Sequence, residues 1–154
     1  MRSEYENYIN PNTTKKDLDE IMSKQTLNDL HLGFSSNITQ IRFQSLINKA
    51  ETITKLHVDC CLFNPFNQTL CVENLMDLLR ICSENLKELY LDEFGVAIIL
   101  TSDNFKQILD ICKNLEKIKV FGSIYCGKLL FTKFDAIDMV KKYPKITTID
   151  IVIF

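Results

Sequence analysis

The two histidines, His31 and His57, are the residues of this chain with the widest chemical repertoire. Imidazoles on neighbouring strands could share a metal ion, with Asp29 or Asp59 adding a carboxylate, or could serve as a base beside a thiol. A structural zinc site, however, usually needs four ligands with Cys or His among them. We therefore expect no metal and no other cofactor.

Six cysteines offer the second source of chemistry. Cys60 and Cys61 are adjacent, so they lack the Cys-x-x-Cys spacing of redox and zinc sites. Cys82 and Cys112 each end a helical run of apolar residues, which predicts buried core thiols. The chain has no Gly-x-Ser-x-Gly motif, no phosphate loop and four glycines in all, so we expect no enzyme. A small thiol or histidine hydrolase is the alternative; it would need Cys60 or Asp59 in a pocket beside the histidines.

Composition narrows the class of partner. The formal net charge is −2, and no run of Lys or Arg exceeds two residues, which argues against a nucleic acid and against a membrane surface. The chain has no long uncharged apolar window, and its polar start, MRSEYENYINPNTT, does not read as a signal peptide. A cytoplasmic or nuclear location is expected. The alternative, a secreted or effector-type recognition protein, would use the sequons at Asn12, Asn37 and Asn67.

One pattern, L-x-x-L-x-L with any aliphatic residue at each L, occurs five times. The matches are Leu27–Leu30–Leu32, Ile53–Leu56–Val58, Leu86–Leu89–Leu91, Leu115–Ile118–Val120 and Ile146–Ile149–Ile151. Such near-constant spacing of about 30 residues indicates a repeat architecture. The alternation within each match predicts a short strand.

Helical periodicity precedes each strand. The apolar sets are Leu18, Ile21, Met22; Phe43, Leu46, Ile47, Ala50; Leu75, Leu78, Leu79, Cys82; Phe105, Ile108, Leu109, Cys112; and Ala136, Met139, Val140, Tyr143. Four residues before each set stands a helix-capping residue or its replacement: Thr14, Thr39, Cys71, Thr101 and Thr132.

Helices and strands that alternate with such short crossovers predict an α/β fold with a parallel sheet. At this repeat length the expected form is a curved solenoid, with the strands on its concave face and the helices outside. The repeat domain is predicted over residues 14–154, after a polar segment at 1–13. The apolar last strand, IDIVIF, has no polar cap after it and fits a fragment of a longer array.

The repeats resemble the leucine-rich repeat family, and most closely its cysteine-containing subclass. The elements that carry the resemblance are Ile38-Thr39, Leu100-Thr101, Phe131-Thr132, Cys112-Lys113-Asn114-Leu115, Tyr143-Pro144-Lys145-Ile146, and Cys61 at the ninth position of its repeat. In that family the subclass is typical of F-box proteins, the substrate receptors of cullin-type ubiquitin ligases. The resemblance implies a protein-binding arc without an activity. It implies docking to a cullin-ligase adaptor only through an F-box, which is missing from this chain.

The third, fifth and seventh positions of each match are predicted to point to the concave face. We expect a protein partner to bind there, through Asp29, His31, Lys55, His57, Asp59, Glu88, Tyr90, Asp92, Lys117, Lys119, Phe121, Thr148 and Asp150. His31, His57 and Tyr90 would form an aromatic anchor stripe, since aromatic groups are enriched at binding hot spots. The simpler interpretation is a solvated ladder of cross-strand pairs, worth roughly 0.2–1 kcal/mol each.

Overall fold

The computed structural model describes residues 8–9, 14–33, 49–59, 68–94, 100–122, 124–126 and 129–153. Its main sheet has six strands in the order β1-β2-β3-β4-β6-β9, and every neighbouring pair is parallel. The strands are β1 (Tyr8–Ile9), β2 (Asn28–Gly33), β3 (Ile53–Asp59), β4 (Glu88–Phe94), β6 (Lys117–Gly122) and β9 (Thr148–Ile153). The predicted α/β class with a parallel sheet is confirmed.

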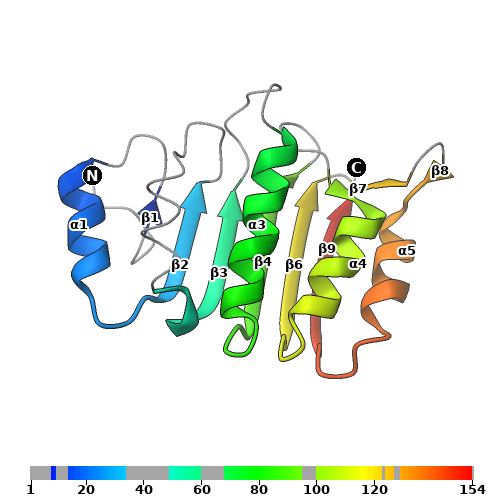
Figure 1. Ribbon diagram of the computed structural model, residues 1–154. Helices are drawn as coiled ribbons and strands as arrows, with labels where there is room; N and C mark the ends of the chain where they lie inside the picture. The colour runs from blue at the N-terminus through cyan, green and yellow to red at the C-terminus, as the bar shows by residue number, and fades with distance from the viewer. Residues whose placement is uncertain are drawn as a thin grey trace.

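Helices alternate with these strands along the chain. They are α1 (Lys15–Ser23), the short 3-10 helix η1 (Ala50–Thr52), α3 (Gln68–Cys82), α4 (Ser102–Ile111) and α5 (Lys133–Val140). Figure 1 shows α3 and α4 crossing in front of the sheet, with α1 toward the β1 end and α5 toward the β9 end. One sheet face therefore meets helices, and the core lies between these two layers.

The repeated L positions form that core. Leu30, Leu56, Leu89 and Ile118, the second L of four successive repeats, are each 0% exposed. Leu78, Leu79, Ile108 and Leu109 cover them from α3 and α4 and are also fully buried. Each such side chain contributes about 1.5–3 kcal/mol through its removal from water. Most of the predicted apolar positions are thus confirmed as the core, whereas Met22, Met139, Tyr143 and Ile149 are only partly buried at its edge.

Three of the predicted helix caps are confirmed. The hydroxyls of Thr14, Thr101 and Thr132 accept hydrogen bonds from the backbone N–H of the third residue that follows each. In α4 and α5 the third residue, Asn104 or Asp135, also accepts a hydrogen bond from the N–H of its threonine. These reciprocal bonds satisfy two backbone donors that a helix start leaves without an intrahelical partner.

Two helix boundaries differ from the sequence prediction. Cys71 was expected at a helix start, but α3 begins at Gln68, so Cys71 lies inside the helix. A cysteine cannot cap as a threonine does, and so it does not stop the helix from extending toward its N-terminus. Tyr143 was expected on the buried face of the last helix, but α5 ends at Val140. The half-buried Tyr143 instead donates a hydrogen bond from its hydroxyl to Asp110 near the end of α4. The predicted helix at Phe43–Ile47 and the cap at Thr39 lie outside the described residues.

A second, small sheet was not expected. Its strands are β5 (Leu100–Thr101), β7 (Ile124–Cys126) and β8 (Leu129–Leu130), in the order β5-β7-β8. The β5–β7 pair is parallel and the β7–β8 pair is antiparallel. These residues lie in the stretches predicted to be return loops, and Leu100-Thr101 pairs at the same point where Thr101 caps α4. The β5–β7 pair therefore joins segments of successive repeats in parallel, as the main strands do, whereas β7 and β8 pair within one repeat.

Asparagine side chains join the turns of successive repeats. The amide of Asn85 donates to the carbonyl of Glu51 at 2.6 Å, and the amide of Asn114 donates to the carbonyl of Glu84 at 2.9 Å. Both asparagines directly precede the first L of their repeats. The side chain thus reaches back to the preceding repeat just before the two strands begin to pair.

The N-terminal segment adds a short strand to the main sheet. The residues of β1 belong to the polar segment predicted to precede the repeats, yet they pair with His31 and Leu32 of β2. Among the helices in the described ranges, none is both long and apolar enough to cross a lipid bilayer.

We predict that Thr132→Ala lowers the free energy of unfolding by about 1 kcal/mol, because the start of α5 loses its side-chain acceptor. Thr132→Ser keeps the hydroxyl and is the matched control. Urea unfolding at pH 7 measures both. Equal stability of the alanine and serine variants would show that this cap does not stabilise the fold.

The partner of that cap adds a dependence on pH. The hydrogen bonds from Thr132 lower the pKa of Asp135 below its usual value of 3.8. As the pH falls toward and below 3.8, the unfolded chain binds the proton first, so stability decreases. Asp135→Asn supplies the same acceptor that Asn104 supplies in α4, but it does not titrate. We expect the variant to lose less stability than the parent between pH 5 and about 3 in thermal melts; parallel losses would contradict this.

Candidate functional site

The face of the main sheet that lies opposite the core carries the residues predicted to bind a partner, wherever their side chains are described. We call it the polar face and define it by the third, fifth and seventh positions of the repeats. The third-position row pairs Asp29, Lys55, Glu88, Lys117 and Thr148 in register. The fifth-position row pairs His31, His57, Tyr90, Lys119 and Asp150. The seventh-position row pairs Gly33, Asp59, Asp92, Phe121 and Val152. The predicted register is confirmed in all three rows.

Three rings of the fifth-position row stack across adjacent strands. The centroids of His31 and His57 lie 4.2 Å apart with 17° between their planes. The centroids of His57 and Tyr90 lie 5.7 Å apart at 27°. His31 is only 4% exposed, whereas His57 and Tyr90 are half-buried. The predicted aromatic stripe is therefore present as a stack of three rings. The stack is buried at His31 and partly exposed to solvent at His57 and Tyr90.

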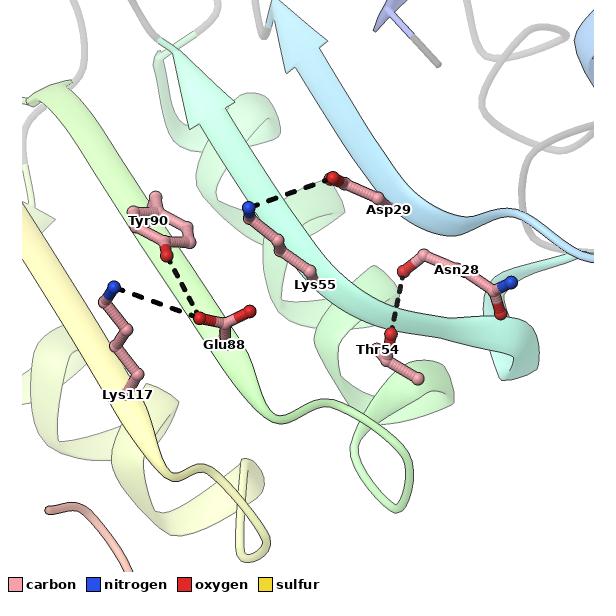
Figure 2. Close-up of polar contacts among 7 residues, drawn as sticks. All are labelled: Asn28, Asp29, Thr54, Lys55, Glu88, Tyr90 and Lys117. Carbon is pink, nitrogen blue, oxygen red and sulfur yellow. Dashed lines mark hydrogen bonds and ion pairs between the residues drawn. The ribbon is translucent and has the colours of Figure 1, made fainter. Parts of the chain in front are cut away.

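Two lysines converge on Tyr90. The ammonium nitrogens of Lys55 and Lys117 each lie 5.4 Å from the centroid of its ring, within the range of cation–π attraction. The Tyr90 hydroxyl also donates a hydrogen bond to Glu88 at 3.2 Å. Figure 2 shows Tyr90 on β4 between the side chains of Lys55 on β3 and Lys117 on β6. The interaction with Tyr90, and then the charges of Glu88 and Asp150, raise the pKa of Lys117 above its ordinary value. Lys117 therefore stays charged beside the ring.

Opposite charges pair across neighbouring strands. Lys55 lies 3.8 Å from Asp29, Lys117 lies 4.0 Å from Glu88, and the third pair joins Lys119 and Asp150 at 3.9 Å. Figure 2 shows the first two pairs side by side. These side chains are about a third to a half exposed, so water screens each pair and its contribution is roughly 0.2–1 kcal/mol at most. The ion pairs fix the positions of these side chains on the polar face, but they add little to the stability of the fold.

A groove of about 510 Å³ lies over the middle of this face. It is lined by Lys55, His57, Tyr90, Leu91, Asp92, Lys119 and Phe121. On its floor the Nε2 atom of His57 lies 3.6 Å from a carboxylate oxygen of Asp92, a diagonal contact from β3 to β4. The groove thus combines an aromatic floor, two lysines, one carboxylate and the ring of Phe121. That mixture suits a polypeptide surface with both polar and apolar groups.

Val152 belongs with these residues, although it was not predicted to bind. It is the register partner of Phe121, and the two side chains are 43% and 37% exposed. Its place in the seventh-position row was readable from the repeat pattern, but its apolar type gave no functional signal. Asp59 occupies the same row as the register partner of Asp92. Thr148 and Asp150 lie on β9, at one end of the sheet.

The cysteines and histidines do not converge on a reactive site among the described residues. Burial raises the pKa of the Cys82 and Cys112 thiols to about 12, so neither is a thiolate at neutral pH. Cys60 and Cys61, which the hydrolase hypothesis requires, lie outside the described residues. Within the described ranges, no group of three or more His, Cys, Asp or Glu side chains is placed to hold a metal ion.

We predict that Cys82 and Cys112 react with iodoacetamide about a thousandfold more slowly in the folded chain than in urea at pH 8, because each pKa rises from 9.0 to about 12. Peptide mass spectrometry reads each site separately. Fast labelling of either cysteine without denaturant would mean that the helix end around it opens. That result would support the alternative hypothesis of a thiol-dependent hydrolase.

Comparisons with known proteins add no relative to this description. The chain matches no protein-family model, and no curated protein sequence matches it.

Proposed function

We propose that this chain is a leucine-rich repeat solenoid that acts as a non-enzymatic protein-interaction scaffold and binds its partner on the polar face. The in-register parallel strands, the α-helices that come before β2, β4, β6 and β9 along the chain, and the repeat of about 30 residues support this assignment. In a solenoid the sheet surface away from the helices presents one side chain of each row per repeat. A partner can then contact several repeats at once.

The observation that carries the proposal is the aromatic stack, because two of its rings, His57 and Tyr90, line the groove. His57 and Tyr90 are held in place by ring contacts on adjacent strands, and Tyr90 is held further by two lysines and Glu88. A partner that packs on side chains already ordered in this way loses little additional conformational entropy. Tyr is also among the residue types that dominate measured binding energies. The exposed Phe121 and Val152 extend the same surface with apolar area.

The charge pattern supports a folded protein as the partner. The third-position row alternates acid and base from Asp29 to Lys117, and every lysine of the face lies within 4.0 Å of a carboxylate. A polyanion such as DNA would meet repulsion from these carboxylates as often as attraction from the lysines. A protein surface of mixed sign can match both.

The more specific role that we infer is substrate recognition for an F-box ubiquitin-ligase receptor in the cytoplasm or nucleus. This inference rests on the resemblance to the cysteine-containing repeat subclass. Cys82 and Cys112 are both buried at helix ends, which agrees with a packing role for the cysteines of the pattern.

We predict that replacing Tyr90 and Lys119 together by alanine removes the partner. The parent chain and the double variant are used as bait in a lysate, and captured proteins are quantified by mass spectrometry. Because hot-spot truncation costs about 2 kcal/mol or more, at least one partner should fall by tenfold or more. Both side chains lie on the polar face, so the melting temperature should change little.

The matched control is Asp77→Ala with Arg80→Ala on α3. It removes an exposed pair of comparable size from the helix side. The control should retain the partner at the level of the parent chain. Equal capture by parent, control and polar-face variant would place binding elsewhere on the molecule and contradict the proposal, as would a parent chain that captures no protein specifically.

A further inference from the structure

We propose that two copies of this chain pair through the outer edge of β9 and form a closed dimer with one continuous sheet. The surface involved, which we call the end surface, consists of β9 together with Phe134 and Ile137 of α5. β9 lies at one edge of the main sheet, and its outer side pairs with none of the described strands (Figure 1). The inference does not depend on partner binding at the polar face.

The end surface exposes apolar side chains of a kind that the earlier repeats bury. Ile149 occupies the second L position, which is 0% exposed in the four preceding repeats, but Ile149 itself is only partly buried. Ile153, on the same side of β9, is also partly buried. Phe134 on α5 is 73% exposed, more than any other large apolar side chain of the described residues. Such an apolar area marks a site where another protein layer packs.

The repeat pattern identifies the side of α5 that faces outward. Asp110 of α4 accepts the hydrogen bond of Tyr143 from the following repeat, so its side of the helix faces the next repeat. The corresponding position in the last helical unit is Lys141, which directly follows α5. Ile137 lies four residues before Lys141 and Phe134 lies seven before it, so the three share this side. Phe134 and Ile137 therefore stand beside the open edge of β9.

The backbone of β9 offers three residues to a new strand. The N–H of Thr148 donates to the carbonyl of Glu116 at 3.2 Å, and the backbone groups of successive strand residues point to opposite sides. Thr148 and every second residue after it therefore face β6. The residues whose N–H and C=O groups face outward are Ile149, Ile151 and Ile153.

These three isoleucines are self-complementary about a two-fold axis at Ile151. In an antiparallel pair of β9 strands, Ile151 faces its own copy and Ile149 faces Ile153, so every outward N–H and C=O group of the three finds a partner. On the polar face Asp150 then faces Val152 and not a second carboxylate. Centring the pair on Asp150 or Val152 would leave an isoleucine without these hydrogen bonds, and the first choice would also oppose two like charges.

The same axis places α5 antiparallel to its copy. Along α5 the acidic Asp135 and Asp138 outnumber Lys133, whereas Lys141 and Lys142 directly follow the helix. Antiparallel neighbours bring the acidic part of one helix toward the basic end of the other. This charge complementarity favours a second copy of the chain over an unrelated occupant of the edge.

β9 lacks the features with which natural edge strands prevent pairing. It has six residues with no Pro, Lys or bulge, and its one charge, Asp150, lies 3.9 Å from Lys119 of its own chain. At the other edge of the main sheet β1 is only two residues long. One edge can pair and the other is too short, so the assembly closes as a dimer and does not grow into a fibre.

The mass of the chain in solution is the first test. Sedimentation velocity over a concentration series should show conversion from 17.9 kDa to twice that mass. Ile153→Pro removes an outward N–H but no hydrogen bond to β6. Ile153→Ala removes the same side chain, keeps the N–H and is the matched control. The proline variant should dissociate at a concentration about tenfold or more above that of the alanine variant. Urea unfolding checks that both variants fold.

Disulfide trapping tests the register. An equimolar mixture of Asp150→Cys chains and Val152→Cys chains, oxidised mildly, should give a 150–152 link in peptide mass spectrometry. The two positions form a non-hydrogen-bonded pair with a Cα spacing of about 4.5 Å, which a disulfide can span. Each variant alone is the control and should form no link between its own new cysteines.

A mass that stays at 17.9 kDa over the whole soluble range, or species heavier than the dimer, would overturn the proposal. Equal association of the proline and alanine variants would do the same, and a 150–150 link would refute the pairing centred on Ile151. A monomeric chain that loses a captured lysate protein in Ile153→Pro but not in Ile153→Ala would assign the edge to another protein. None of these outcomes changes the capture experiment on Tyr90 and Lys119, so the two proposals fail separately.

Discussion

Parallel pairing of β2, β3, β4, β6 and β9 in one common register is the constraint on which the rest of the structure depends. Side chains alternate between the two faces of a strand, so a slip of one residue would turn Leu56 or Leu89 toward solvent and His57 or Tyr90 into the core. Fixing one row therefore fixes all of them. The asparagine bonds from Asn85 and Asn114 to the preceding repeat act at the point where this register is set.

The two faces of the sheet make unequal contributions to stability. Each fully buried L position contributes about 1.5–3 kcal/mol, whereas each exposed ion pair of the polar face contributes roughly 0.2–1 kcal/mol at most. The core face therefore determines whether the chain folds. The polar face is left comparatively free to vary its side chains with little effect on folding. This difference explains how a row can place His31 and His57, and then Tyr90, on consecutive strands without disturbing the repeat.

The polar face is nevertheless ordered, because its side chains contact one another across strands. Tyr90 is central to this order, since it meets His57, Glu88 and two lysines. The contacts are individually weak, but together they restrict the rotamers around the groove. A surface that is preorganised in this way supports the recognition role that we propose. Among the described residues it brings together aromatic and paired charged groups, while the described thiols are buried and protonated.

The amino-acid sequence by itself determined the alternation of helix and strand in the described residues, most of the buried positions, the strand register and the threonine caps of α1, α4 and α5. All of these follow from short-range periodicity and from capping chemistry that acts over three residues. Tertiary structure decided the features that depend on how long side chains and loops meet in space: the convergence of Lys55 and Lys117 on Tyr90, the diagonal contact of His57 with Asp92, and the second sheet of β5, β7 and β8. A repeat pattern specifies which residues are neighbours in a row, but the rotamers and the twist between strands select which diagonal neighbour each side chain reaches.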